Sequence, residues 1–164
     1  MTEGPYNVLF LCTGNSARSI MAEAILNHKG KPNFTAYSAG SHPSGTVHPA
    51  ALRQLNIAHV PANGLRSKPW DEFSRPGAPP LHFVFTVCDK AAKEVCPIWP
   101  GQPMTAHWGV SDPAAVQGAT EQAERAFRAA FVLLDRRISL LLSLPLASLG
   151  RLALKREIAK IGQQ

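Results

Sequence analysis

The chain of 164 residues has only three cysteines and no hydrophobic run long enough to cross a membrane. Three thiols are too few for the disulfide framework of a small secreted protein, so each is a candidate for catalysis, redox chemistry or metal binding. No basic stretch precedes the first apolar segment, and we therefore expect a cytoplasmic protein without a signal peptide. The most apolar stretch, Ile138 to Leu149, contains Pro145 and is shorter than the roughly 20 residues that a bilayer requires.

The sequence also has no block of residues of one charge sign. Its net charge is +6, but from Glu121 to Glu157 basic and acidic residues are interleaved. Such a distribution is typical of a solvated surface that mildly attracts anionic substrates, and it argues against a nucleic-acid partner.

Neither a repeat nor a linker divides the sequence, and its 45% hydrophobic content suits one domain over residues 1–164. Short apolar segments predict strands at Tyr6 to Leu11, Phe34 to Ser38, His82 to Val87 and Met104 to His107. Helical patterns predict helices at residues 20–28 and 49–56, from Ala114 to Leu141, and over 147–161. Alternating strands and helices predict an α/β fold with a parallel sheet covered on both faces.

The last helical segment belongs to a C-terminal extension at about residues 141–164, beyond a core at about residues 6–140. We expect this extension to dock either on the body of the molecule or on a second subunit, which would make a homodimer.

The loop from Cys12 to Arg18, with sequence CTGNSAR, follows the first predicted strand and precedes the first predicted helix. Backbone N–H groups at a helix start, the helix dipole and the forked guanidinium of Arg18 favour an anion there. Gly14 permits positive φ and Asn15 tolerates the left-handed conformation, so the loop can turn its N–H groups inward. We expect the oxyanion to be bound by Thr13, Gly14, Asn15, Ser16, Ala17 and Arg18.

The same field favours the thiolate of Cys12, which would be a nucleophile aimed at the central atom of a tetrahedral oxyanion. Ser19 is placed to donate a hydrogen bond to this sulfur. The alternative is that Cys12 only ends a buried strand, as cysteines often do.

Asp112 is the candidate general acid for the oxygen that leaves the bound oxyanion. It lies in the segment HWGVSDP, just past the fourth predicted strand, at the carboxyl edge of the sheet where sites of open α/β folds gather. The alternative role is to cap the helix predicted to begin near Ala114.

Cys88 follows the third predicted strand, at the same sheet edge as Cys12, and Cys96 lies eight residues later. If Cys12 forms a covalent adduct, Cys88 can attack it and Cys96 can attack the resulting disulfide. Alternatively, Cys88 is a core residue and Cys96 is incidental. We expect no metal, because the cysteines and histidines do not form a closely spaced four-ligand set for zinc.

Four ordered motifs give the chain a family resemblance over about residues 6–135: Val8 to Glu23, Tyr37 to Gly40, Thr86 to Cys88 with Cys96 to Pro100, and His107 to Gly109 with Asp112-Pro113. It resembles an arsenate reductase built on the low-molecular-weight protein tyrosine phosphatase fold. The resemblance implies a four-stranded parallel sheet of order 2-1-3-4, with helices on both faces.

By that resemblance, Cys12 attacks arsenate, Arg18 binds the oxyanion and Asp112 is the general acid. Cys88 then displaces arsenite to leave a Cys12–Cys88 disulfide, and Cys96 converts it to Cys88–Cys96. An external thiol donor, thioredoxin or glutaredoxin with glutathione, reduces that last disulfide, and no bound cofactor is implied. The segment between Cys88 and Cys96 is expected to unwind so that the disulfide becomes exposed.

The sequence departs from the family pattern at a potassium site and in the spacing of the two later cysteines, which bears on the electron donor. Lys68 stands where some relatives have an acidic residue that helps hold potassium, alongside Asn15, Glu23 and Ser38. Its ammonium could replace the cation and pair with Glu23, so we expect no potassium requirement. The spacing from Cys88 to Cys96 is one residue longer than in the thioredoxin-coupled pattern, which leaves the donor open.

Two other functions compete with arsenate reduction. A low-molecular-weight phosphatase would use Cys12 and Asp112 on a phosphomonoester, since phosphate and arsenate share shape and charge. However, Ala114 and Ala115 follow the Asp-Pro pair and offer no aromatic wall for a phenol, so we expect phosphatase activity only as a weak side reaction. A non-catalytic oxyanion-binding module would not need the nucleophile.

Overall fold

The computed structural model describes residues 5–116, 118 and 120–164, and its centre is a parallel sheet with strand order β2-β1-β3-β4. This confirms the expected α/β class and strand order. In chain order the elements are β1 (Tyr6–Leu11), α1 (Arg18–Lys29), β2 (Phe34–Ala39), α2 (Pro49–Ile57), a 3-10 turn (Trp70–Phe73), β3 (Phe83–Thr86), α3 (Asp89–Ala92), β4 (Met104–His107), a second 3-10 turn (Pro113–Ala115), α4 (Thr120–Leu142) and α5 (Arg151–Ile161).

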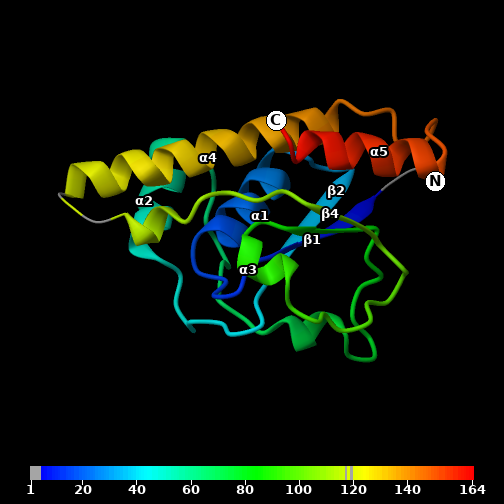
Figure 1. Ribbon diagram of the computed structural model, residues 1–164, viewed down its shortest axis with the longest axis horizontal. Coiled ribbons are helices and arrows are strands. Elements are labelled where there is room, and N and C mark those ends of the chain that lie inside the picture. Colours follow the sequence, from blue (N-terminus) through cyan, green and yellow to red (C-terminus); the bar gives the residue numbers. More distant parts are fainter. Residues whose placement is uncertain (1–4, 117, 119) are drawn as a thin grey trace.

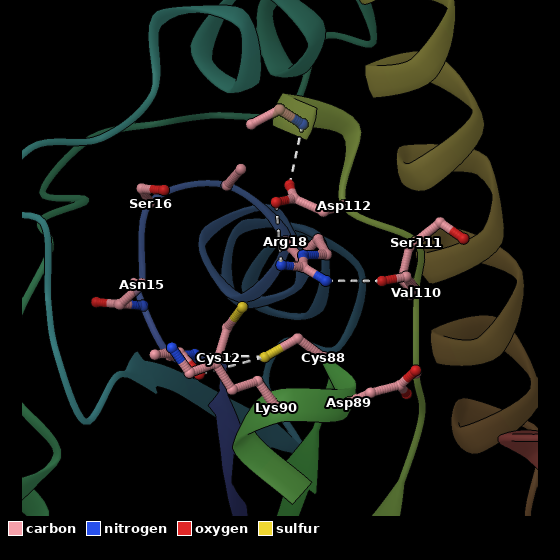
Figure 2. A pocket seen from close by; sticks show the side chains of 15 residues that line it. Cys12, Asn15, Ser16, Arg18, Cys88, Asp89, Lys90, Val110, Ser111 and Asp112 are labelled. Atoms are coloured by element: carbon pink, nitrogen blue, oxygen red, sulfur yellow. Dashed lines mark hydrogen bonds and ion pairs between the residues drawn. The ribbon is translucent and has the colours of Figure 1, made fainter. Parts of the chain in front are cut away.

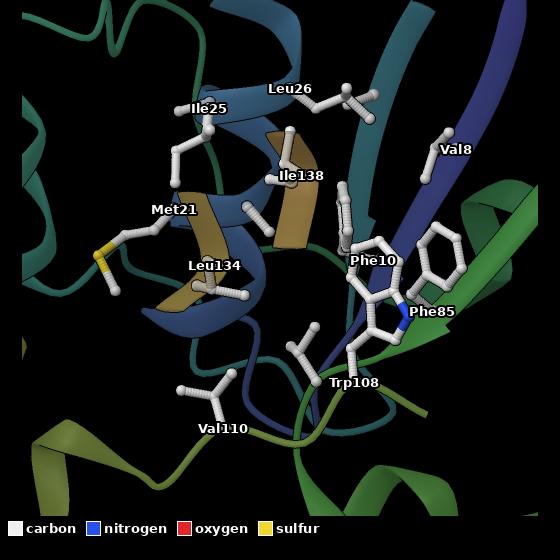
Figure 3. Packing of buried hydrophobic residues seen from close by; sticks show 14 of the residues in the cluster. Val8, Phe10, Met21, Ile25, Leu26, Phe85, Trp108, Val110, Leu134 and Ile138 are labelled. Carbon is white, nitrogen blue, oxygen red and sulfur yellow. The ribbon is translucent and has the colours of Figure 1, made fainter. Parts of the chain in front are cut away.

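Alternate residues of the two central strands face two separate cores, as the two-residue period of a strand requires. The larger core lies between the sheet and helices α1, α2, α4 and α5, and it contains Val8, Phe10, Phe83 and Phe85 (Figures 1 and 3). The opposite face is covered more thinly, by the 3-10 turn Trp70–Phe73 and by Trp99. Leu9, Leu11 and Val84 point into this smaller core.

Several element boundaries differ from the sequence expectations, for local reasons. The long C-terminal helix begins at Thr120 instead of Ala114, because residues 113–115 form a 3-10 turn and Gly118 has a φ of 124° that no helix accommodates. It ends at Leu142, shortly before Pro145, whose ring disfavours helix at the preceding residue. The last helix begins at Arg151 and not at 147, and α3 covers only Asp89–Ala92 of the segment between the later cysteines.

The C-terminal extension docks on the body of its own chain. Leu154, Ile158 and Ile161 of α5 are buried in the larger core, and α5 contacts β4 and α4 (Figure 1). The indole Nε1 of the buried Trp108 donates a hydrogen bond of 2.9 Å to the carbonyl of Ile158. The homodimer stays a prediction.

Among the residues described, no helix is both long and apolar enough to span a membrane.

Candidate active site

The loop between β1 and α1 is held by hydrogen bonds on its outer side. The carbonyls of Thr13, Gly14 and Ser16 accept from the backbone amides of residues 42, 44 and 48, respectively, at 2.8–2.9 Å. Because a trans peptide directs its N–H opposite to its C=O, amides of the loop turn toward the cavity side. Inward-facing amides were expected of this loop, whereas the supporting segment 42–48 was not foreseen; anion binding stays a prediction.

Asn15 is the residue that makes the tight turn of the loop. It is fully buried and has a φ of 43°, so the left-handed conformation falls on Asn15, whereas Gly14 does not have the positive φ that was expected. Its Nδ2 donates to the hydroxyl of Ser19 at 2.8 Å, and its Oδ1 accepts from the backbone N–H of Lys68 at 2.9 Å. Ser19 thus contacts Asn15, and the expected hydrogen bond to Cys12 is not among those formed by the described residues.

Gly40, at the end of β2, is required by close packing against the same loop. A Cβ at this position would lie 2.4 Å from the carbonyl oxygen of Thr13 and 2.5 Å from that of Cys12. Contacts so short with backbone atoms exclude any side chain.

A cavity of about 560 Å³ opens above the loop (Figure 2). Three segments line it, and each follows the carboxyl end of a strand: residues 12–18 after β1, residues 88–90 after β3, and residues 109–112 with Ala114 after β4. The cavity therefore brings together Cys12, Arg18, Cys88 and Asp112, as predicted, and leaves Cys96 outside.

Arg18 links the loop to the segment that carries the candidate acid. Its Nη1 donates to the carbonyl of Val110 at 2.8 Å, and its Nη2 lies 3.7 Å from Oδ2 of Asp112 (Figure 2). The guanidinium is thereby held at the cavity, with the Arg18 side chain 15% exposed.

Asp112 combines the two roles that the sequence left open. Its Oδ1 accepts from the backbone N–H of Ala114 at 3.0 Å and so caps the 3-10 turn Pro113–Ala115, while its Oδ2 faces Arg18. The cap fixes the direction of the carboxyl group at the cavity wall.

Cys12 and Cys88 are buried free thiols that line the same cavity (Figure 2). The interaction with Cys88 and burial raise the pKa of Cys12, and these effects outweigh the lowering by Arg18. In this arrangement the electrostatics oppose the low-pKa thiolate that was expected at Cys12.

The electrostatics of the pair favour the thiolate on Cys88. The interaction with Cys12 lowers the pKa of Cys88 to about 5, against burial, with help from the N–H groups of Thr13 and Ala91. Both amide nitrogens are 3.4 Å from its sulfur. The sequence predicted that both thiols lie at one sheet edge, but it did not indicate that the two amides would stabilise Cys88 as the thiolate.

Cys96 is exposed and lines a different cavity of about 300 Å³, together with Ala91, Ala92, Trp99 and His107 among others. Its thiol donates to the carbonyl of Glu94 at 3.8 Å. Burial and the nearby Glu94 carboxylate raise the pKa of Cys96, so this thiol is protonated at neutral pH.

Lys68 lies beneath the loop, where the resemblance implied a cation in some relatives. Its Nζ is 3.4 Å from Oε1 of Glu23 and 3.4 Å from the hydroxyl of Ser38, and it donates to the carbonyl of Arg66 at 2.9 Å. Burial lowers the pKa of Lys68, and Glu23 opposes this effect. The ammonium takes the place of a cation at these oxygens, so the residues do not fit a potassium ion.

Two polar groupings near Cys88 were not predicted. His107 bridges Thr86 and Asp89 at 2.7 and 2.8 Å, and so ties the first residue of α3 to the ends of β3 and β4. Glu94 accepts from the hydroxyls of Thr13 and Ser41. No sequence pattern marks these contacts, since they join residues from separate loops.

A buried thiol and an arginine at the loop after β1, with an aspartate across the cavity, give this α/β protein a site with the features of a cysteine-dependent oxyanion site. Residues 7–157 match the family described as low molecular weight phosphotyrosine protein phosphatase, and the chain belongs to this family.

Sequence relatives in the family include arsenate reductases. The chain is 35% identical over 115 residues to "Arsenate reductase" of Shouchella clausii, a match that covers 70% of this chain and 79% of the relative. The protein of the same name from Bacillus subtilis is also 35% identical over 115 residues, with the same coverage. The resemblance stated from the motifs is thus confirmed.

A solved structure described as an arsenate reductase in the phosphate binding state has a TM-score of 0.69 and 25% identity, and covers 84% of this chain and 97% of its own. The low molecular weight protein tyrosine phosphatase from T. tengcongensis shares the fold, with a TM-score of 0.64 at 23% identity over 82% of this chain and 95% of its own.

Proposed function

We propose that this protein is an arsenate reductase that uses Cys12, Cys88 and Cys96 in turn. The observation that carries the proposal is the position of Cys88. Its side chain lines the same cavity as Cys12 and the electrostatics favour its thiolate, which a phosphatase would not need. The relatives at 35% identity that are named arsenate reductase support the same function.

In the first step the loop amides and Arg18 hold arsenate while the sulfur of Cys12 bonds to arsenic. One As–O bond breaks, and Asp112 donates a proton to the oxygen that departs as water. The proton lost by the Cys12 thiol balances the one that Asp112 gives up. The raised pKa of Cys12 means that this proton is lost during the attack, after the substrate has bound.

In the second step the thiolate of Cys88 attacks the sulfur of Cys12. The new S–S bond replaces the S–As bond, whose electron pair stays on arsenic, so arsenic is reduced by two electrons and leaves as arsenite. Cys96 then attacks Cys88, and Cys12 departs as a thiolate. An external dithiol, thioredoxin or glutaredoxin with glutathione, reduces the Cys88–Cys96 disulfide.

The second candidate function is phosphomonoester hydrolysis, which the family match favours. The anion loop would bind phosphate equally well, and water would resolve a phosphocysteine at Cys12. The lining of the cavity contains no aromatic side chain among the described residues, so the site has no wall for a phenol ring. We therefore place this activity second, as a weak side reaction.

We also propose that residues 1–164 form one domain and that the protein acts in the cytoplasm, where three unpaired thiols stay reduced. Its partners would be the oxyanion and the thiol donor, without a nucleic acid or a membrane. A homodimer through the C-terminal extension would use the exposed side of α5, where Leu152 is 64% exposed.

Arsenate-dependent consumption of reducing equivalents tests the proposal, with thioredoxin and with glutaredoxin in separate assays. Cys88→Ser should abolish arsenate turnover yet keep or increase hydrolysis of an aryl phosphate, because the group that most raises the pKa of Cys12 is weakened. Retained hydrolysis also shows that the variant is folded. If wild-type protein turns over no arsenate with either donor, the phosphatase is the better assignment.

A further inference from the structure

Glu94 joins the segment between the two later cysteines to the anion loop. Its Oε1 accepts from the hydroxyl of Thr13 at 2.9 Å, and its Oε2 accepts from the hydroxyl of Ser41 at 2.5 Å. The ring of His42 lies 3.6 Å from the same carboxylate. The Glu94 side chain is only 19% exposed, so these contacts are partly shielded from water.

Between Glu94 and the buried Trp99, this segment is weakly held. Val95 and Ile98 are each 94% exposed, and residues 93–99 form no helix or strand. Within the described chain, no amide of residues 95–99 donates to a backbone carbonyl outside a helix or strand. Glu94 is therefore the main polar attachment of the stretch that carries Cys96.

Cys96 and Cys88 face different cavities. Cys88 lines the oxyanion cavity, whereas Cys96 lines a separate one together with Ala91 and Ala92. The backbone carbonyl of Glu94 also accepts from the Cys96 thiol at 3.8 Å. Glu94 thus restrains both the segment and the sulfur.

Thr13 connects this attachment to the relay. Its amide donates to Cys88, and its hydroxyl lies 3.7 Å from the same sulfur while donating to Glu94. A hydroxyl has a single proton, so Glu94 keeps the Thr13 proton away from Cys88. When Cys88 moves to form the first disulfide, its contacts with Thr13 change, and Thr13 is the residue that holds Glu94.

We propose that Glu94 is a positioning residue that latches the Cys96 segment to Thr13 and Ser41 in the reduced enzyme and must be released before the second disulfide forms. This inference rests on the proposed function. In the step it controls, Cys96 gives its proton to solvent and bonds to the sulfur of Cys88. The Cys12–Cys88 bond breaks, Cys12 leaves as a thiolate, and no net oxidation occurs.

A single-turnover experiment with arsenate and no external donor tests the latch. Quenched samples are alkylated, and peptide mass spectrometry follows the Cys12–Cys88 and Cys88–Cys96 disulfides. Glu94→Ala should accelerate conversion of the first disulfide to the second by about tenfold, the effect of losing a charge-assisted hydrogen bond. The yield of disulfide per arsenate should stay unchanged, Ser41→Ala should give a smaller acceleration, and the exposed neighbour Lys93→Ala should give none.

Hydrogen exchange on the resting protein provides a readout that does not need arsenate. Amides of residues 93–99 should exchange faster in Glu94→Ala than in wild type, and Glu94→Gln, which keeps a neutral acceptor, should lie between them. A conversion rate that is unchanged or slower in Glu94→Ala, with wild type forming both disulfides, would overturn the latch alone. Unchanged exchange would also overturn it, whereas a wild type without any disulfide would overturn the proposed function.

Discussion

The ammonium of Lys68 lies 3.4 Å from Oε1 of Glu23, beneath the anion-binding loop and only 5% exposed. The backbone N–H of the same lysine donates to Asn15, the residue in the left-handed conformation at the turn of the loop. A fixed positive charge is therefore part of the support of the loop.

Activity should not depend on potassium, because the Lys68 ammonium already neutralises Glu23 and contacts Ser38. Initial rates of arsenate turnover should agree within error in sodium and potassium buffers of equal ionic strength. The variant Lys68→Asp removes the ammonium and adds a carboxylate, so its activity or thermal stability should become sensitive to potassium. Strong potassium activation of the wild type would contradict the assignment.

The thiolate of the resting enzyme should belong to Cys88 and not to Cys12. Since the pKa of Cys88 is lowered to about 5 and that of Cys12 is raised, thiolate absorbance at 240 nm should rise through a step near pH 5. The group is protonated below this step and charged above it. The step should vanish in Cys88→Ser and move to higher pH in Cys12→Ser, because that variant weakens the interaction that contributes most to the shift. A step that survives in Cys88→Ser would assign the charge to Cys12.

Asp112→Asn should lower kcat for aryl phosphates with poor leaving groups by about 10²–10⁴-fold, the range for losing a general acid. The amide can still accept from Ala114, so the cap and the fold are retained. With a good leaving group, which needs little protonation, the loss should be much smaller. An equal loss for both leaving groups would show that Asp112 positions Arg18 without donating a proton.

The sheet, the anion loop and the meeting of Cys12, Cys88, Arg18 and Asp112 could be predicted because strand periodicity and order bring loop residues to one carboxyl edge. The charge of the thiol pair could not. Besides Cys12, it depends on two backbone amides whose nitrogens lie 3.4 Å from the Cys88 sulfur, and any residue type except proline supplies such groups.

The sequence predicted that the C-terminal extension docks, but it left open whether on its own body or on a second subunit, for the same reason. Its anchors are backbone carbonyls: Ile158 accepts from Trp108, and Gly162 and Gln164 accept from Arg137. The buried Arg137 also donates to the carbonyls of Trp108 and Gly109 at 2.8 and 2.9 Å. The extension thus braces the strand end that leads to Asp112.

Trp108→Phe should therefore loosen α5 and disturb the acid segment. Phenylalanine can still stack on Phe85, whose ring centroid is 3.9 Å from that of Trp108, but it leaves the carbonyl of Ile158 without its donor and a smaller ring in the core. The two effects should lower the free energy of unfolding in urea by about 3 kcal/mol. Hydrogen exchange should accelerate at residues 151–161 before it does in β1, and kcat for arsenate should fall more than KM changes.

Trp70→Phe, on the thinly covered face of the sheet, is the matched control and should leave exchange in α5 unchanged. If α5 exchanges at the wild-type rate in Trp108→Phe, the indole hydrogen bond does not hold the extension, and the brace must come from Arg137 and the buried apolar side chains of α5.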